Sequence, residues 1–400
     1  MHEKISNCFK DLFLAHKNEN IAAGVILPEK IHVTRGKQVR RQPVQGFSLS
    51  ILFNILKTNR FQVDWQCLDK LGYLFFTSII HSVLSGCESR RFSMEIDSTK
   101  LAAPPIFLIG HWRNGTTFLH NLMCRDPNHT FLRTYQALAP GSFLFSDVQK
   151  FAGRMDPIIP IKKRPMDNVK FGVYEPAEDE FAMAALTGIS PYMEVLFPIK
   201  YGKESDYKYP DFRNEQEKEL WGKAFVYLLK KLTVFENKRI VLKSPPHTAR
   251  IKTLLELFPD ARFVHIIRNP YDVFPSNLKL WRDAFSLSFL QTVNNNEIIE
   301  IILSNYEQMY KRFHEEKSLI PDSNFVEIRF EDLEKDPLGR MRFIYDRLGL
   351  PDFDIFSSYA SAHIKSLGNY KKNIFRLSPS IKKRIRKKWL QTFDIYGYDI

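Results

Sequence analysis

The sequence predicts an α/β fold, with a central, mostly parallel sheet flanked by helices. Short apolar runs bounded by Gly or Pro have the length of buried strands, and stretches with helical spacing follow them. Strands that alternate with helices are typical of parallel sheets. The composition, 44% hydrophobic and 26% charged, is that of a folded globular protein, and the length of 400 residues excludes a minimal stapled scaffold.

The domain organisation follows from where these strands begin. Residues 1–100 have a mainly helical pattern and carry no recognisable chemistry, and the first clear strand comes only after them. We therefore predict a helical N-terminal extension, residues 1–100, and a main domain, residues 101–400. The chain contains no internal repeat and no low-complexity linker, so one integrated domain is favoured over two.

The first predicted strand is the apolar run PPIFLIG at residues 104–110. A turn at residues 111–115 follows it, and the amphipathic stretch TTFLHNLM at residues 116–123 predicts a helix. Strand, loop and helix thus follow one another without an intervening linker.

A second unit of the same kind begins with the strand RIVLK at residues 239–243. Pro245 and Pro246 forbid its continuation, and residues 247–258 have helical spacing of apolar side chains. The run RFVHII at residues 262–267 predicts another buried strand. Two parallel strands joined by a helix need a right-handed crossover.

The last part of the chain adds helices and one strand. Long helical patterns run from about residue 283 to residue 316, and residues 325–329 predict a strand. Asp336 is placed to cap a helix that begins at Pro337, and Gly349 ends that helix.

Residues 71–86, LGYLFFTSIIHSVLSG, are the most apolar segment of the chain. The run is shorter than the ~20 apolar residues that a membrane crossing needs, and it contains hydroxyl side chains and a histidine. We interpret it as a buried helix, with a membrane-surface role as the second alternative. The N-terminus shows no secretory signal, and the four cysteines show no zinc-site spacing, so we expect packing thiols and a cytoplasmic location.

The net charge of +13 is concentrated in two stretches. Residues 30–62 carry seven basic residues and no acid, and residues 365–393 carry ten and no acid. Such runs are usually solvated helix faces, although they also attract anionic molecules or anionic membrane surfaces.

The loop at residues 110–117 carries the clearest chemical signal. Gly110 and Gly115 have the spacing G-x-x-x-x-G of a phosphate-binding loop between a strand and a helix. Backbone N–H groups of such a turn converge on an anion, and the helix N-terminus adds partial positive charge. The loop therefore predicts a polyanionic ligand.

The chain lacks two residues of the usual nucleoside triphosphate-binding pattern, and their absence restricts the class of ligand that the loop is expected to bind. Thr116 stands where a lysine follows the second glycine, and no apolar strand ends in the aspartate that helps to hold Mg²⁺. Two strands end instead in Lys243 and Arg268. This pattern predicts an anion held by protein cations without a metal.

Three sequence blocks carry a resemblance to a known family. RNGTTFL at residues 113–119 resembles the 5′-phosphosulfate loop of sulfotransferases that use 3′-phosphoadenosine 5′-phosphosulfate (PAPS), and residues 241–281 resemble the segment that holds the 3′-phosphate. EPAEDEFA at residues 175–182 is similar to an acidic segment of the broad, mostly bacterial-type branch. The resemblance spans about residues 104–350 and implies a P-loop-like sulfotransferase fold in which residues 101–400 are catalytic.

The resemblance also implies a donor site. Arg268 and Ser276 are expected to hold the 3′-phosphate. The 5′-phosphosulfate is expected to bind to Arg113, Asn114, Gly115, Thr116, Thr117 and Phe118. The chain departs from the family pattern at Trp112, where proline is usual, and at Asn114, which replaces Ser or Thr and which we expect to donate to a phosphate oxygen.

The expected catalytic groups are a cation and a base. Lys243 matches a family lysine that reaches the transferring sulfuryl group, where one buried cation accelerates the reaction by about 10² to 10³. The acceptor must lose a proton, and we expect Glu178 to take it, with His247 second and Glu180 and His111 as further candidates. Adjacent acids raise each other's pKa when they are close and poorly solvated.

Three hypotheses follow. The first is a PAPS-dependent sulfotransferase that transfers a sulfuryl group to a hydroxyl, or an amine, of a small-molecule or lipid-like acceptor, without a metal and without a nucleic-acid partner. The second is a P-loop nucleotide kinase or NTPase, which predicts Mg²⁺-dependent ATP binding. The third is a non-enzymatic basic protein that binds nucleic acid or a membrane surface.

The resemblance also implies a basic loop at residues 368–372 over the 3′-phosphate. The acceptor and the oligomeric state are left open.

Overall fold

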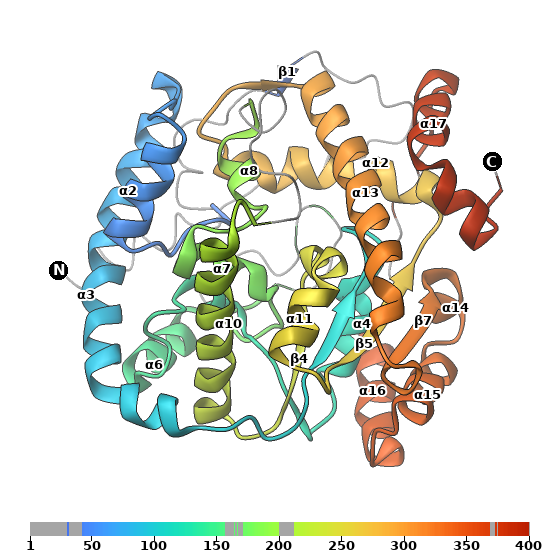
Figure 1. The fold of residues 1–400 in the computed structure, drawn as a ribbon, viewed down its shortest axis with the longest axis horizontal. Coiled ribbons are helices and arrows are strands. Elements are labelled where there is room, and N and C mark those ends of the chain that lie inside the picture. Colours follow the sequence, from blue (N-terminus) through green and yellow to red (C-terminus); the bar gives the residue numbers. More distant parts are fainter. Residues whose placement is uncertain are drawn as a thin grey trace.

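The computed structural model describes residues 30–31, 42–156, 164, 166, 171–199, 212–368, 373 and 375–399. Its centre is a five-stranded sheet in which every neighbouring pair is parallel, so the prediction of a mostly parallel sheet is confirmed. The order across the sheet is β3 (His129–Thr130), β4 (Arg239–Lys243), β2 (Ile106–Ile109), β5 (Arg262–Ile267) and β7 (Phe325–Arg329). Helices cover the sheet on both faces (Figure 1).

Alternation along β2 explains the two layers. Phe107 and Ile109 pack into the larger hydrophobic core, whereas Ile106 and Leu108 pack into the smaller one on the opposite face. The larger core also holds side chains from α10 (Glu215–Phe235), α11 (Ile251–Leu257), α12 (Pro270–Asp283), α13 (Asn295–Glu316) and α17 (Pro379–Tyr396). The smaller core holds those from α4 (Thr116–Met123), α14 (Phe330–Lys335), α15 (Pro337–Leu348) and α16 (Phe353–Leu367).

Several predicted elements are confirmed residue by residue. The strands at residues 239–243, 262–267 and 325–329 and the helix at 116–123 have the predicted bounds. The Asp336 side chain accepts a hydrogen bond from the Gly339 N–H, and Gly349 ends α15 in a left-handed conformation. These elements carry strong local signals, because caps and prolines restrict the backbone directly.

Two predicted helices differ from the structure. Residues 247–258 are split into a 3₁₀ turn, η4 (Pro245–Ala249), and α11, because the two prolines favour a tight turn and Arg250 has a non-helical backbone. The helix predicted from about residue 283 begins at Asn295 instead, where Asn294 and Glu297 form a capping box. The 3₁₀ turn η5 (Phe285–Ser288) precedes it.

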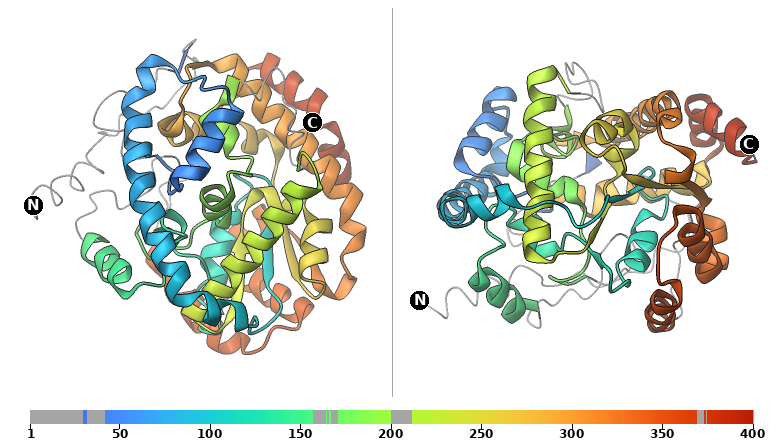
Figure 2. Two further views of the ribbon diagram at one scale, coloured as in Figure 1. Left: turned by 60° about the vertical axis from the view of Figure 1, so that its left-hand side comes forward. Right: turned by 60° about the horizontal axis from the view of Figure 1, so that its bottom comes forward.

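The described part of residues 1–100 forms one side of the molecule. Helices α2 (Leu49–Thr58) and α3 (Leu68–Ser98) stand side by side there, joined by the 3₁₀ turn η2 (Trp65–Cys67) (Figures 1 and 2). β1 (Lys30–Ile31) pairs antiparallel with β6 (Val293–Asn294). Several side chains of α2 and α3 enter the larger core. The division into an extension and a catalytic domain stays a prediction.

The prediction of a buried helix at residues 71–86 is wrong for one face of α3. Phe75, Phe76 and Val83 are each more than half exposed. By length and composition the helical segment Trp65–Ser98 is apolar enough to cross a membrane, with 22% of its most apolar stretch buried.

Candidate functional site

The loop after β2 adopts a conformation that only its own residues permit. Gly110, Arg113 and Gly115 all have positive φ, of +143°, +73° and +96° respectively. A Cβ at Gly115 would lie 2.1 Å from the Phe330 ring, so the loop approaches α14 more closely than any other residue allows. α4 begins directly afterwards at Thr116, so the N–H groups of Thr116 and Thr117 have no partner within the helix.

Asn114 fixes this loop to the rest of the fold. Its side chain is fully buried, and its Nδ2 donates to the Ile266 carbonyl at 3.0 Å and to the Tyr310 hydroxyl at 2.8 Å. The expectation that the Asn114 amide donates to a phosphate oxygen is therefore wrong in this structure, because both donors point into the protein. An asparagine suits this position because it ties β5 and α13 to the loop.

The two arginines of the predicted donor site lie together. Arg113 Nε donates to Ser276 Oγ on α12 at 2.9 Å, and Arg268 Nη1 donates to the Arg113 carbonyl at 3.1 Å. The Arg268 guanidinium also stacks 4.5 Å above the Phe330 ring. Three separate chain segments thus place cationic and hydroxyl groups around one point beside the loop.

Arg268 has capacity for an anion. Its Nε is buried and has no hydrogen-bond partner among the described residues, and its nearest carboxylate, Asp272, is 3.8 Å away. Burial lowers the pKa of Arg268 from its ordinary value, and the charge of Arg113 lowers it further, whereas Asp272 opposes both effects. An anion bound here would relieve the repulsion between two guanidinium groups and pair the unsatisfied N–H.

Lys243 lies between the loop and a carboxylate. Its Nζ is 2.5 Å from Glu178 Oε1 and 3.5 Å from Thr117 Oγ1, and its side chain is 2% exposed. Burial lowers the pKa of Lys243, and the charge of Glu178 opposes that shift. Tyr192 donates its hydroxyl to the other Glu178 oxygen, and burial raises the pKa of that phenol, which keeps it a donor.

The acidic segment at the start of α7 (Asp179–Thr187) pairs with the end of β4 and the turn that follows it. Each of its three consecutive acids takes one basic partner, and the three pairs are Glu178 with Lys243, Asp179 with His247 at 2.5 Å, and Glu180 with Arg250 at 2.8 Å. Burial alone would raise the pKa of Asp179, but the charge and hydrogen bond of His247 lower it. The expected rise in pKa is therefore wrong for Asp179, because its interaction with His247 outweighs the effect of burial.

The structure distinguishes among the four candidate bases. His247 is fully buried, with its ring 5.3 Å from Phe107 and 5.4 Å from Phe225, so its contacts are those of a packing side chain. His111 is also buried, and burial lowers its pKa to about 3. Glu180 is held by Arg250 in the interior. Glu178 is the candidate that lies beside both Lys243 and the loop.

Of the remaining residues predicted to bind the donor, some have positions that suit this role and others do not. Thr116 and Thr117 form the first turn of α4, at the anion-binding end of the helix. The Phe118 N–H already donates to the Gly115 carbonyl, and its ring packs against the smaller core, so its side chain has a packing role. Of the predicted basic loop only Gly368 is described, and residues 369–372 lie outside the described residues.

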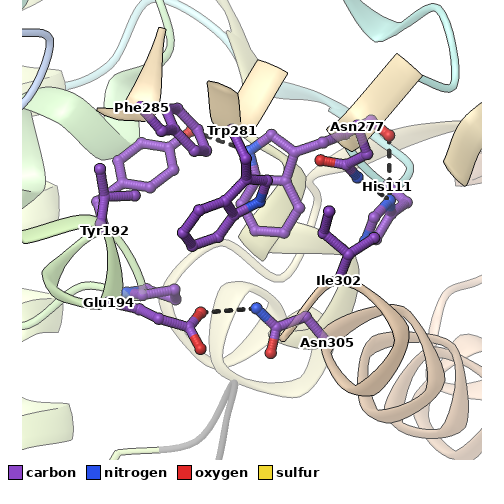
Figure 3. Close-up of a pocket in the computed structure, with 11 residues that line it drawn as sticks. His111, Tyr192, Glu194, Asn277, Trp281, Phe285, Ile302 and Asn305 are labelled. Carbon is purple, nitrogen blue, oxygen red and sulfur yellow. Dashed lines mark hydrogen bonds between the residues drawn. The ribbon is translucent and has the colours of Figure 1, made fainter. Parts of the chain in front are cut away.

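A small pocket adjoins Tyr192. Aromatic side chains form much of its wall, and Glu194 from α8 (Met193–Leu196) and Asn305 from α13 face each other within it (Figure 3). Asn305 donates to Glu194 at 2.6 Å. Tyr192 therefore contributes to the pocket wall and, through its hydroxyl, contacts Glu178. The sequence analysis did not identify Tyr192 as a site residue, because no local sequence signal shows that its hydroxyl contacts Glu178, 14 positions earlier.

No group of three or more His, Cys, Asp or Glu side chains in the described part of the chain could hold a metal ion. The site instead combines the loop after β2, two arginines, and the buried ammonium group of Lys243 with the carboxylate of Glu178 beside it. A fold and site of this kind define an enzyme that transfers a group from an anionic donor.

The chain belongs to the sulfotransferase family, whose model matches residues 104–354. Omega-hydroxy-beta-dihydromenaquinone-9 sulfotransferase Stf3 of Mycobacterium bovis is 32% identical over 354 residues, which cover 88% of this chain and 90% of that protein. The protein of the same name from Mycobacterium tuberculosis matches equally. The protein is accordingly a sulfotransferase.

Two solved structures share the fold. Sulfotransferase STF9 from Mycobacterium avium superposes with a TM-score of 0.61 at 16% identity, over 89% of this chain and 98% of that one. Sulfotransferase STF1 from Mycobacterium tuberculosis gives a TM-score of 0.57 at 19% identity, over 85% of this chain and 91% of that one.

Proposed function

We propose that the sulfuryl donor is PAPS and that Arg113 and Arg268 both contact it. The observation that carries this proposal is the contact of Arg268 with the Arg113 carbonyl, which brings two cations from separate strand ends to one ligand-sized region beside α4. Arg268 with Ser276 binds the 3′-phosphate. The backbone N–H groups of the loop and of Thr116 and Thr117 bind the 5′-phosphosulfate, together with Arg113.

We place the reacting sulfur between Thr117 and Glu178, where Lys243 lies. The acceptor oxygen forms a bond to sulfur as the bond from sulfur to the bridging phosphate oxygen breaks. The electron pair of the broken bond leaves with 3′,5′-adenosine bisphosphate, whose growing negative charge Lys243 neutralises. Glu178 takes the proton of the attacking hydroxyl.

We propose that the acceptor is a hydroxyl group on a hydrophobic molecule. The M. bovis relative is named for an ω-hydroxylated menaquinone, an isoprenoid quinone with a terminal hydroxyl. The aromatic wall of the pocket beside Tyr192 suits the apolar part of such a molecule, and the Tyr192 hydroxyl links that wall to Glu178. Transfer of labelled sulfate from PAPS to a set of hydroxylated lipids and small alcohols tests this class.

The donor proposal is tested by thermal shift of the full chain with 3′,5′-adenosine bisphosphate, ATP with Mg²⁺, or a DNA oligomer. We expect only the bisphosphate to stabilise the protein strongly, since ligand binding to the folded state raises its stability. Arg268→Ala should weaken bisphosphate binding by about tenfold or more, because a charge-assisted bidentate contact is lost.

The matched control is Arg262→Ala, which removes an arginine from the opposite end of the same strand, β5. It should leave the affinity unchanged. Stabilisation by ATP with Mg²⁺ alone would contradict the donor, and preserved affinity in Arg268→Ala would place the 3′-phosphate elsewhere.

A further inference from the structure

A continuous apolar surface runs along the outer side of α2 and α3. Its side chains are between 41% and 70% exposed. They are Phe53, Phe61, Trp65, Leu68, Phe75, Phe76, Ile79, Ile80 and Val83, which together are named here the α2–α3 apolar surface. Both helices lie at one side of the molecule in Figure 1, and that side faces the viewer in the left view of Figure 2. A contiguous exposed surface of this kind marks an interaction site.

Helix α3 turns large apolar side chains outward. Its inward face buries Leu74 and Ile96 together with the charged Lys70 and Glu88, whereas its outward face carries Phe75 and Ile79. A helix that packs on a hydrophobic core normally turns its apolar face inward and its charges outward. The apolar face of α3 is therefore free to meet an apolar environment outside the protein.

The inward charges are firmly paired. Lys70 Nζ donates to the Ser286 and Phe289 carbonyls at 3.3 and 3.2 Å. Glu88 forms a fully buried ion pair with Lys231 on α10. These bonds hold both halves of α3 against the body of the protein, so the helix lies along its surface and is not positioned to cross a bilayer by itself.

The charges around the surface favour an anionic lipid bilayer over a protein partner. Residues 71–87 contain no Lys, Arg, Asp or Glu. Along the two helices and the residues that join them, from residue 57 to residue 100, five basic and three acidic side chains are exposed. The basic residues are Lys57, Arg60, Arg90, Arg91 and Lys100, and the acidic ones are Asp69, Glu95 and Asp97. An apolar stripe with aromatic residues and flanking cations is the pattern of a helix that lies in the membrane interface.

We propose that the α2–α3 apolar surface docks the enzyme on a lipid bilayer that contains anionic headgroups. The apolar side chains enter the boundary between headgroups and acyl chains, and the flanking cations pair with the headgroups. Lys70 joins this surface to η5, whose Phe285 lines the pocket beside Tyr192. If the acceptor is a membrane lipid, which rests on the proposed function, docking brings the enzyme to the membrane that contains its substrate.

The test is flotation of the full-length protein with vesicles of phosphatidylcholine alone or with phosphatidylglycerol added. We expect the wild type to float with the anionic vesicles. The double variant Phe75→Gln/Ile79→Gln should bind these vesicles at least about tenfold more weakly than the wild type, because two large apolar side chains no longer enter the bilayer. The control Phe343→Gln/Ile355→Gln, on α15 and α16, removes side chains of similar exposure and should bind as the wild type does.

Absence of wild-type binding, or equal loss in both double variants, would overturn the proposal. Light scattering that shows a wild-type dimer and a monomeric Phe75→Gln/Ile79→Gln variant would also overturn it, since the surface would then join two copies of the chain. The thermal shift with 3′,5′-adenosine bisphosphate confirms that each variant is folded. Because vesicle binding requires no sulfuryl transfer, an error in the donor proposal would abolish that shift in every variant and leave flotation intact.

Discussion

Lys243 combines deep burial with two polar contacts that face in different directions. Its ammonium group is 2.5 Å from Glu178 and 3.5 Å from the Thr117 hydroxyl. In a poorly solvated site a fixed charge acts on a developing anion more strongly than it would in water. The same side chain therefore compensates a buried carboxylate in this structure and is the cation that we propose to neutralise the leaving phosphate.

Lys243→Ala should lower the rate of sulfuryl transfer by about 10² to 10³, by analogy with the loss of one oxyanion donor. Binding of 3′,5′-adenosine bisphosphate should remain near the wild-type value, because the two arginines are unchanged. Single-turnover transfer from labelled PAPS measures the first effect and calorimetry the second. The exposed Lys252→Ala serves as the control, and undiminished transfer in Lys243→Ala would refute the role.

Glu194 is a buried carboxyl group whose effect on the stability of the folded protein depends on pH. Burial raises its pKa to about 7, and the hydrogen bond from Asn305 opposes part of that rise. A folded-state pKa above the unfolded value means that the folded protein holds the proton more tightly. No cost arises below the unfolded pKa of about 4.3, and the cost grows as the pH rises through 7.

Glu194→Gln should therefore stabilise the protein at pH 8 by up to about 3 kcal/mol, because the variant has no charge to bury. The advantage should shrink as the pH falls and vanish near pH 4. Urea unfolding of both proteins across this range measures the difference. An advantage that is the same at pH 5 and pH 8 would show that Glu194 is not the titrating group.

At the scale of elements, ion pairs and hydrogen bonds join the start of α7 to the end of β4 and the turn that follows it; these contacts are named here the clamp. Besides the three acid–base pairs, the Glu180 N–H donates to Ser244 Oγ at 2.9 Å, and the Gly110 N–H donates to Thr248 Oγ1 at 2.7 Å. The clamp thus joins the acidic segment to η4 and η4 to the start of the anion-binding loop. Two pairs of the clamp are structural, and the Glu178 pair is the one that borders the site.

Glu180→Leu should destabilise the fold by about 3–5 kcal/mol, because it leaves the buried Arg250 without its carboxylate. The double variant Glu180→Leu/Arg250→Met should recover much of that loss, since it removes both buried charges. Chemical denaturation of the single and double variants gives the coupling energy. Equal stability of the two variants would indicate that the ion pair contributes little.

At the scale of the whole molecule, the parallel sheet brings the residues of the candidate site together at one edge. β2 lies between β4 and β5, with Leu108 opposite Lys243 and Ile109 opposite His265, so the three strands end at the same edge. The loop after β2, Lys243 at the end of β4 and Arg268 just after β5 therefore meet there. Ligands of open parallel sheets bind at this edge, where connections diverge to opposite faces.

Local signals explain why so many elements were predictable. The strand bounds of β4, β5 and β7 and the cap at Asp336 depend on residues within a few positions of one another. The prediction failed where a distant contact decides the outcome. The outward face of α3 is an example, because hydrophobicity marked it as core, whereas the buried Lys70 and Glu88 pairs turn that face away from the body.

The amino-acid sequence by itself determined the fold class and the sulfotransferase family, because glycine spacing, apolar strands and strand-end cations are local properties of the chain. Only the tertiary structure decided which acid meets which cation, that Asn114 points inward, and that Tyr192 joins the pocket to Glu178. Those contacts link residues from about 14 to 200 positions apart. Such pairings are set by strand order and packing, which no short segment encodes.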